Sequence, residues 1–330
     1  MGSGYRRGRA EAWVPYKVSV MRFLDAARQL KHWMFIADRR MRRIGAGVAD
    51  PLFAQVAAAR GFAYNPERYV MRGGPHGTQV MSTGSTFPLD HLRFETTLPT
   101  QNAAATPRRL FLLWPGDNEM TANRRTTVER IRQQVPHGVD VELITPRGLQ
   151  DIEISDMPLH PAYRHLSAVH RSDYLRAYLM YHHGGAYLDI KPFRTDLASA
   201  FDRLDAQPDV WAIGAPETPV NTRHLTGGPL ARATRRNVTL TLSQAAVAFR
   251  PHTPLAAEWL EEVNRRLDYF SGLLEASPAR TPYGDHDDYP VPWFALLSSV
   301  LAPLCLKYQE HVVTDAGFAT WANSGYSSYR

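Results

Sequence analysis

Two kinds of apolar pattern alternate along most of the chain. From Arg108 onward, short apolar runs are separated by longer segments in which apolar residues recur every three or four positions. The runs predict strands over 108–116, 138–146, 186–190 and 209–215, and the longer segments predict helices over 121–134, 164–183 and 196–204. This order predicts an α/β fold with a largely parallel sheet covered by helices on both faces. In such folds ligands bind beyond the carboxyl ends of the strands.

The N-terminal region follows a different pattern. Apolar residues between Val20 and Ile44 recur at steps of three and four, which predicts an amphipathic helix. Its other faces carry seven basic residues: Arg22, Arg28, Lys31, Arg39, Arg40, Arg42 and Arg43. Such a helix can pack on its own protein or lie on an anionic membrane. We predict a basic helical extension over 1–71, an irregular linker rich in Gly, Pro, Ser and Thr over 72–106, and the main domain over 107–330.

Composition fits a folded protein. The 330 residues are 44% hydrophobic and 21% charged, and the single cysteine, Cys305, cannot form an internal disulfide. There is neither an apolar run long enough to span a bilayer nor the apolar core of a signal peptide. We therefore expect a cytoplasmic protein that can touch the cytoplasmic face of a membrane through its basic helix.

The positive charge is concentrated at one end of the chain. Net charge is +6, but residues 1–50 carry eleven Lys/Arg against four Asp/Glu, so the remaining residues are close to neutral. A basic arm on a near-neutral body points to anionic lipid, a polymer or a protein partner. Nucleic acid is not the expected partner, because the body lacks basic clusters interleaved with aromatic residues.

The predicted helix over 164–183 has two distinct faces. One carries the mainly apolar set Leu175, Tyr178, Leu179 and His182. The other carries His170, Asp173 and Arg176 at steps of three, which places a carboxylate and a guanidinium side by side. Gly184 is placed to end the helix in the left-handed conformation, and His183 beside it favours the negative end of the helix dipole.

Asp189 ends the short strand that follows. A carboxylate at the end of a buried strand needs a cation, a metal ion or hydroxyl donors. Lys191 comes two residues later. Simple pairing of Asp189 with Lys191, Arg176 or Arg194 explains these residues as well as a binding site does.

The neighbouring motifs favour the binding site. The segments SDYLR (172–176) and GGAYLD (184–189) together resemble the sugar-binding region of DxD glycosyltransferases. That family includes capsular polysaccharide synthesis proteins, the yeast initiating mannosyltransferase and the clostridial glucosylating toxins. The likeness extends, in ordered blocks, over roughly 106–310. Near its start lie a strand, a tryptophan and a glycine turn. Downstream come the segment "QAAVAFRPHTPLAAEWLEEV" and the late segment "YPVPWFALLSSVLAPLCLKY".

The resemblance implies a GT-A type fold, Rossmann-like, with a mostly parallel central sheet and a helical N-terminal extension. It also implies transfer of a sugar from a nucleotide-diphosphate sugar to a hydroxyl of a glycan or glycolipid. No residue stands out as a general base, which fits a retaining transfer. Capsule or other polysaccharide biosynthesis would be its setting.

The resemblance also implies roles for individual residues. Trp114 would stack on the nucleotide base, unless it is a core tryptophan. Asp173 and Arg176 would hold the donor's sugar hydroxyls and phosphate region, unless they form an exposed ion pair. Tyr187 belongs to the same donor-binding set. Asp189 would accept hydrogen bonds from hydroxyls or reach a metal ion.

Lys191 departs from the family pattern. There, a second carboxylate coordinates a divalent cation that neutralises the leaving diphosphate. An ammonium group cannot ligate a metal, but it can supply positive charge to the diphosphate. We therefore assign catalysis to Asp189, Lys191 and Arg176. Mg²⁺ or Mn²⁺ at Asp189 is the alternative, with an acidic residue from 285–288 as its second ligand.

The loop "TPYGDHDDYP" holds the remaining candidates. Asp285, His286, Asp287 and Asp288 could ligate a metal or supply a base to the acceptor hydroxyl. An acidic loop bounded by Pro and Gly is also commonly just solvated. Because Trp293 follows in the late Pro-x-Trp helix, we expect a mobile loop that covers the donor.

Two other functions remain open at this level. A catalytically silent nucleotide-sugar-binding module would have the same fold, with Lys191 marking a lost metal site. A nucleic-acid-binding protein that uses the basic arm is less favoured, and it would bind with a steep dependence on salt.

Overall fold

The computed structural model describes residues 78–80, 86–88, 95–101, 105–191, 196–217, 233–315 and 317–318. The predicted basic helix between Val20 and Ile44 lies outside these residues, as do most of the predicted linker and Arg194. The predicted boundaries at 71 and 106 therefore stay predictions. Within the described ranges, no helix has both the length and the apolar character to cross a bilayer.

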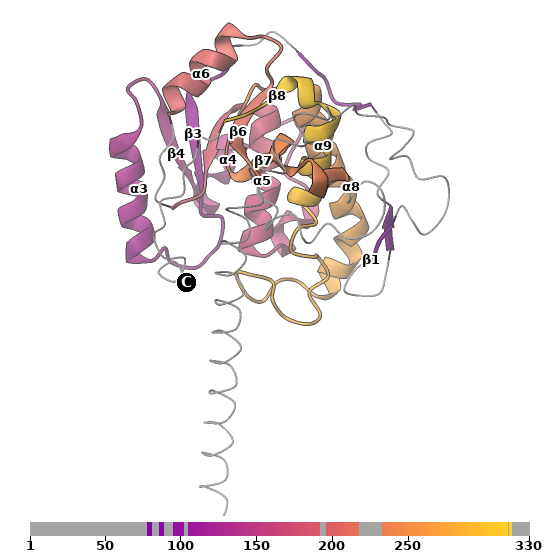
Figure 1. The fold of residues 1–330 in the computed structure, drawn as a ribbon. Coiled ribbons are helices and arrows are strands. Elements are labelled where there is room, and N and C mark those ends of the chain that lie inside the picture. Colours follow the sequence, from indigo (N-terminus) through magenta and orange to yellow (C-terminus); the bar gives the residue numbers. More distant parts are fainter. Residues whose placement is uncertain are drawn as a thin grey trace, which may run out of the picture. The chain divides into compact units, whose positions relative to one another are not determined.

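In the described residues, the central sheet has six strands in the order β4-β3-β5-β7-β6-β8 (Figure 1). They are β3 (Arg109–Leu113), β4 (Asp140–Ile144), β5 (Gly185–Leu188), β6 (Ala212–Pro216), β7 (Leu242–Phe249) and β8 (Val312–Thr314). β3 pairs parallel with β4 and β5, and β6 pairs parallel with β8. β7 runs antiparallel to both of its neighbours. The sheet is thus mixed and mostly parallel, which confirms the α/β prediction. A separate antiparallel pair joins β1 (Thr78–Val80) and β2 (Thr86–Pro88).

The helices largely follow the predicted ranges. They are α3 (Ala122–Gln134), α4 (Leu149–Ile152), α5 (Ala168–His182), α6 (Leu197–Ala206), α8 (Pro254–Ala276) and α9 (Ser298–Lys307). Short 3₁₀ turns are η3 (Pro146–Gly148), η4 (Pro161–His165), η5 (Val238–Leu240) and η6 (Gln309–His311).

Two predicted helix starts are wrong. The helix expected from residue 164 begins at Ala168, because Leu166 is extended and the side chain of Ser167 caps the first turn. The late helix begins at Ser298, so Trp293 lies before it in turns. Residues 293–297 form turns, in which the N–H groups of Ala295 and Leu297 donate to the carbonyl oxygens of Pro292 and Phe294, and Leu297 has non-helical dihedral angles.

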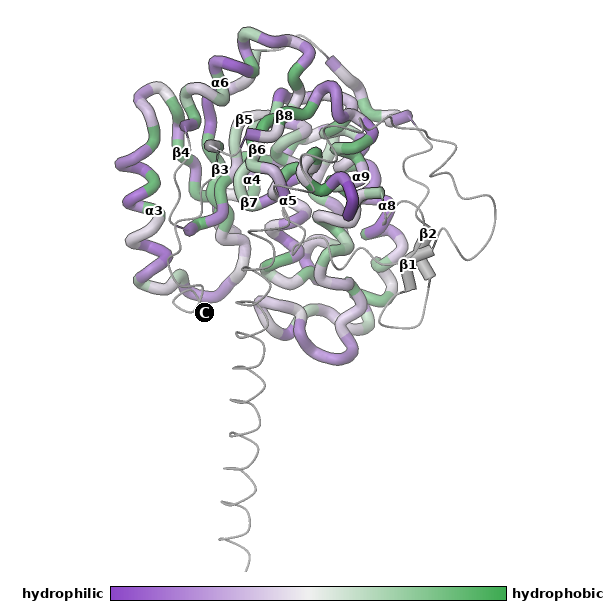
Figure 2. The backbone as a smooth tube through the Cα atoms, in the orientation of Figure 1, coloured by the Kyte–Doolittle hydropathy of each residue, from purple (hydrophilic) through white to green (hydrophobic). Residues whose placement is uncertain are grey.

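Helices cover both faces of the sheet. Leu110 and Leu112 of β3 pack in a cluster with residues of α3 and α6, whereas Phe111 and Leu113 pack in a cluster with residues of α5, α8 and α9. Alternate residues of a strand point to opposite faces, so a three-layer arrangement follows from the sequence of β3 itself. In Figure 2 the strands include many hydrophobic residues, in green, whereas the loop that follows α8 is mainly hydrophilic, in purple.

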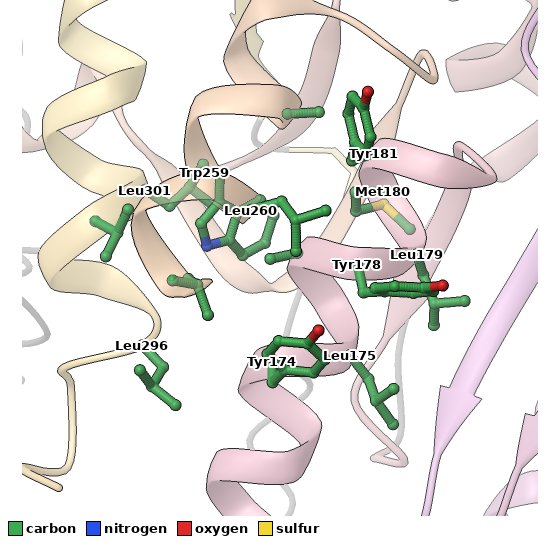
Figure 3. Close-up of a cluster of buried hydrophobic side chains, with 14 of the residues drawn as sticks. Tyr174, Leu175, Tyr178, Leu179, Met180, Tyr181, Trp259, Leu260, Leu296 and Leu301 are labelled. Atoms are coloured by element: carbon green, nitrogen blue, oxygen red, sulfur yellow. The ribbon is translucent and has the colours of Figure 1, made fainter. Parts of the chain in front are cut away.

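The larger cluster fixes α5 in place. Trp259 and Leu260 of α8 lie against Tyr174 and Tyr178 of α5, with Leu301 of α9 on the far side (Figure 3). Burial of each large apolar side chain contributes roughly 1.5–3 kcal/mol. A helix held by so many buried rings has little freedom to shift, and this helix carries two of the predicted site residues.

The end of α5 confirms the predicted terminator. Gly184 and Gly185 have φ values of 61° and 87°, a region that favours glycine. A Cβ at Gly185 would lie 2.7 Å from the carbonyl oxygen of Arg109. The glycine pair therefore lets β5 begin in close contact with β3.

The order of the strands places the two motif loops together. The chain leaves β3 through α3 to reach β4 on one side, and then passes through α5 to reach β5 on the other side of β3. The strand order therefore reverses at β3, and a crevice forms at such a point beyond the carboxyl ends. Trp114 follows β3 directly, and Asp189 follows β5 directly. Both predicted residues thus lie at this edge of the sheet.

Candidate functional site

Asp189 lies immediately after β5, and both of its carboxylate oxygens accept hydrogen bonds. The Tyr187 hydroxyl donates to Oδ1 at 2.7 Å, and the Lys191 ammonium donates to Oδ2 at 2.5 Å. The side chains of Asp189 and Lys191 are 20% and 21% exposed. Of the alternatives open from the sequence, the structure shows the pairing with Lys191. Because the pair is partly exposed, a ligand can reach it.

The backbone of this segment forms a tight turn. The N–H of Asp189 donates to the carbonyl oxygen of Ala245 in β7 at 2.8 Å, and the N–H of Lys191 donates to the carbonyl oxygen of Asp189 at 2.6 Å. Arg124, on the first turn of α3, donates from Nη1 to the carbonyl oxygen of Ile190. Arg124 is not among the residues that the sequence motifs point to. A signal was present, since a cation in the first turn of a helix opposes the helix dipole.

Asp173 and Arg176 form a buried ion pair beneath this turn. Arg176 Nη2 lies 2.7 Å from Asp173 Oδ1, and the two residues are only 7% and 1% exposed. Arg176 Nη1 also donates to the carbonyl oxygen of Gln244 at 2.9 Å, and the guanidinium lies 4.7 Å from the Tyr187 ring centre. The alternative of an exposed ion pair is therefore wrong. The pair instead joins α5 to β5 and β7.

Burial and charge together set the protonation of these groups. Burial raises the pKa of Asp173 to about 7, against the pull of the Arg176 charge. Burial acts on Asp189 in the same direction, but Lys191 and Arg176 outweigh it and hold the pKa of Asp189 below its usual value. Burial would lower the pKa of Arg176, but Tyr187, Asp173 and Asp189 raise it. Asp189 and Arg176 are therefore charged at neutral pH.

Trp114 is partly buried at the start of the loop after β3. Its indole Nε1 donates to the carbonyl oxygen of Asn118 at 2.8 Å, and the side chain packs against the cluster under α3 and α6. Arg171 of α5 donates to the carbonyl oxygens of Pro115 and Arg164, at 3.3 and 2.8 Å. The loop that carries the indole is thus tied to the first turns of α5. Both roles considered for Trp114 are compatible with this position.

The acidic loop after α8 is bonded within itself. Asp285 accepts from the Thr281 hydroxyl at 2.5 Å. Asp288 accepts from the Ser277 hydroxyl and from His286 Nδ1, both at 2.7 Å, and it pairs with Arg280. Bonds from Ser277 and His286 lower the pKa of Asp288, and the bond from Thr281 lowers the pKa of Asp285.

These bonds join His286 to Asp288 and hold Asp285 on Thr281, and none of them reaches Asp189. Among the residues that the structure describes, no three His, Cys, Asp or Glu side chains gather as a metal site.

The same loop is anchored on the first turn of α5. Tyr289 Oη accepts from the N–H of Ser167 at 3.1 Å and lies 2.9 Å from His170 Nδ1. His170 Nε2 lies 3.2 Å from the carbonyl oxygen of Pro292, and its ring is 6.4 Å from that of Trp293. Burial lowers the pKa of His170 to about 4, so this contact is made by a neutral ring. Trp293, 48% exposed, thus contacts His170, which lies one helical turn before Asp173 on α5.

Comparisons with known proteins supply no family for this chain. No protein-family model, no curated protein and no solved structure matches it. The residues and their geometry therefore carry the functional proposal.

Proposed function

We propose that this protein is a glycosyltransferase with a GT-A type domain. It would transfer a sugar from a nucleotide-diphosphate donor to a hydroxyl of a glycan or glycolipid, with retention. One observation carries the proposal: the Asp189–Lys191 pair lies just beyond β5, beside β3, at which the strand order reverses. The buried Asp173–Arg176 pair beneath it supports the proposal, because the family pattern has an aspartate and an arginine at these positions.

Lys191 is the group that would meet the diphosphate. In the structure its ammonium donates to Asp189. A diphosphate, which has a higher negative charge, can replace Asp189 as the partner of this ammonium. Asp189 would then be released to accept hydrogen bonds from sugar or ribose hydroxyls. Partner exchange of this kind needs a pair that solvent can reach, as this one is.

Fixed positive charge would supply most of the catalysis. When the bond between the sugar's anomeric carbon and the diphosphate oxygen breaks, negative charge develops on the leaving phosphate. Lys191 would stabilise it by contact, and Arg176, buried under Tyr187, would stabilise it as a fixed charge. The acceptor oxygen forms the new bond on the same face, and its proton leaves with the phosphate. No protein base is required in this scheme, in keeping with retention.

A divalent cation fits the site poorly. Mg²⁺ and Mn²⁺ take oxygen ligands, and only Asp189 of the two motif positions supplies a carboxylate. The ammonium of Lys191 donates to a carboxylate oxygen of Asp189, and its positive charge would repel a metal ion. We therefore propose donor binding without a metal.

The acceptor side would be formed by the loop between α8 and α9. The exposed indole of Trp293 can stack on a sugar ring. Asp285, His286, Asp287 and Asp288 stay candidates for contacts with acceptor hydroxyls. A cytoplasmic site of action, on a membrane reached by the basic N-terminal helix, completes the proposal.

A silent binding module is the second candidate. It is favoured by one observation, the mutual neutralisation of Asp189 and Lys191, which leaves the motif without a free carboxylate oxygen. Turnover separates the two functions, since a silent module binds the nucleotide sugar without releasing the nucleoside diphosphate.

The first experiment is calorimetric binding of UDP, GDP and their sugars, with EDTA, Mg²⁺ and Mn²⁺ as separate conditions. We expect binding in EDTA, because Lys191 supplies the charge. Binding only with a metal would show that Asp189 recruits a cation despite Lys191. Absence of binding under every condition would refute the transferase and the silent module together.

Replacement of Lys191 by Asp tests the exchange of ammonium for metal. We expect Lys191→Asp to bind UDP or GDP only with Mg²⁺ or Mn²⁺, because the second carboxylate restores a metal-ligand pair. Lys191→Met is the control and should bind weakly in all conditions. Equal metal-free binding by wild type and Lys191→Asp would show that Lys191 does not contact the diphosphate.

A further inference from the structure

Arg124 links α3 to the turn that carries Asp189 and Lys191. Its Nη1 donates to the carbonyl oxygen of Ile190, which is 66 residues away in the chain. The peptide that it holds is the one between the two motif side chains. Because the contact crosses from one secondary-structure element to another, only the tertiary fold creates it.

The contact completes the hydrogen bonding of the turn. The N–H of Asp189 is bound to β7, and the carbonyl of Asp189 accepts from the N–H of Lys191. The carbonyl of Ile190, the central residue, points away from the N–H groups of its own turn and needs an outside donor. Arg124 supplies that donor. The position of Lys191 relative to Asp189 therefore depends on a guanidinium from α3.

Arg125 offers a contrast within the same helical turn. Its side chain is 55% exposed and bonds to Glu119 Oε1 at 2.9 Å and to the carbonyl oxygen of Met120, both on its own segment. Arg124 makes the contact across elements instead. Both cations lie at the positive end of the helix dipole, which is unfavourable for them. An anion beyond the turn would offset that cost for Arg124.

We propose that Arg124 is a positioning residue for the donor diphosphate. By holding the carbonyl of Ile190, it sets the turn in which Lys191 meets the phosphates. A turn fixed before binding loses less conformational entropy when the donor arrives. The guanidinium also adds positive charge where Lys191 replaces a metal-binding carboxylate. This inference rests on the proposed glycosyltransferase function.

The test compares diphosphate with nucleoside binding in the full-length protein. Calorimetry in EDTA measures the affinity for UDP and, separately, for uridine, and likewise for GDP and for guanosine. The proteins compared are wild type, Arg124→Met and Arg125→Met. Methionine keeps an apolar stem and removes the charge and the donors. We expect Arg124→Met to weaken binding of the preferred diphosphate by about tenfold or more, the usual effect of losing a hydrogen bond to a charged group. Nucleoside affinity should stay unchanged, and Arg125→Met should match wild type within about twofold.

The outcomes separate this inference from the function on which it rests. Wild-type affinity for the diphosphate in Arg124→Met, or an equal loss for nucleoside and diphosphate, would overturn the positioning role and leave the transferase intact. Failure of wild type to bind any nucleotide would remove the function and the inference with it.

A second variant covers the case in which Arg124→Met does not fold. Arg124→Lys retains the charge and one flexible donor in place of the planar fork. We expect its diphosphate affinity to fall between wild type and Arg124→Met, about threefold below wild type, with nucleoside affinity unchanged. Equal diphosphate affinity in Arg124→Lys and wild type, with Arg124→Met unfolded, would overturn the proposal.

Discussion

Two acid–base clusters in this domain differ in whether solvent can reach them. Glu262 and Arg266 of α8 pair at 2.6 Å, and their side chains are 2% and 1% exposed. Arg266 also donates to the carbonyl oxygen of Ala295 and to the Ser299 hydroxyl. The Asp189–Lys191 pair is equally short but about a fifth exposed, at the edge of the sheet.

The difference separates an ion pair closed to solvent from one that, in the proposed function, exchanges partners with a ligand. Arg266 holds the segment before α9 against α8, and burial lowers its pKa even though Glu262 opposes this. Arg265, 41% exposed, also donates to Glu262, but the Glu262–Arg266 contact itself is closed to solvent. In the proposed function, Lys191 leaves Asp189 for the diphosphate from a position that is 21% exposed. Under the proposed function, exposure separates the two clusters more sharply than the length of the ion pair does.

The largest effect expected from this comparison is on stability. Glu262→Gln leaves Arg266 buried without its carboxylate, which should lower the free energy of unfolding by about 3–5 kcal/mol. Urea unfolding followed by circular dichroism measures it. The folded fraction should bind UDP or GDP as wild type does. A loss below about 1 kcal/mol would mean that the pair is not a structural one.

The second effect is on catalysis. Lys191→Met should lower the rate of sugar transfer about a hundredfold, as the loss of one charge-stabilising donor does elsewhere. Its free energy of unfolding should change by less than about 1 kcal/mol, because the pair is partly exposed. Release of nucleoside diphosphate from UDP or GDP sugars, with a glycan acceptor present, gives the rate. A destabilised variant with an unchanged rate would reverse the roles given to the two clusters.

The third effect depends on pH and concerns His170. Its ring contacts the carbonyl oxygen of Pro292, in the segment before α9 that Arg266 also holds. Burial lowers its pKa to about 4, whereas an unfolded histidine titrates near 6.5. The stability that it contributes is therefore present above pH 6.5 and is lost as pH falls toward 4. Between pH 7 and 5 this loss is about 2 kcal/mol.

His170→Asn tests that linkage, because asparagine does not titrate. Urea unfolding at pH 7 and pH 5 should show a smaller pH dependence in the variant than in wild type. The ring faces Tyr289, Ser167 and the carbonyl of Pro292, so no carboxylate bonded to it can account for the difference. The same pH dependence in both proteins would show that folding does not lower the pKa of His170.

The smallest effect concerns the exposed edge of the site. Trp293→Ala should raise KM for the glycan acceptor about fivefold, equivalent to about 1 kcal/mol of lost stacking, with kcat and stability nearly unchanged. Tyr269→Ala, another exposed aromatic residue, on α8, is the matched control and should leave KM unchanged. A change in donor KM, with none for the acceptor, would move Trp293 to the donor side.

Local features of the sequence were enough to predict most of the strands and helices of the main domain, though not all of their starts, and two parts of the candidate site. Helical spacing placed Asp173 beside Arg176, and the Gly184–Gly185 pair marked the end of α5, because neighbours within one helix are fixed by its geometry. The apolar run before Asp189 placed that residue at a strand end. These properties depend on residues a few positions apart, so the chain alone determines them.

Only the tertiary structure decided how those parts meet. It made β7 antiparallel, buried the Asp173–Arg176 pair under the sheet edge, and brought Arg124 to Ile190 and Tyr289 to Ser167. These contacts join residues 66 and 122 positions apart. No spacing rule reaches that far, because the order of strands in the sheet determines which loops become neighbours.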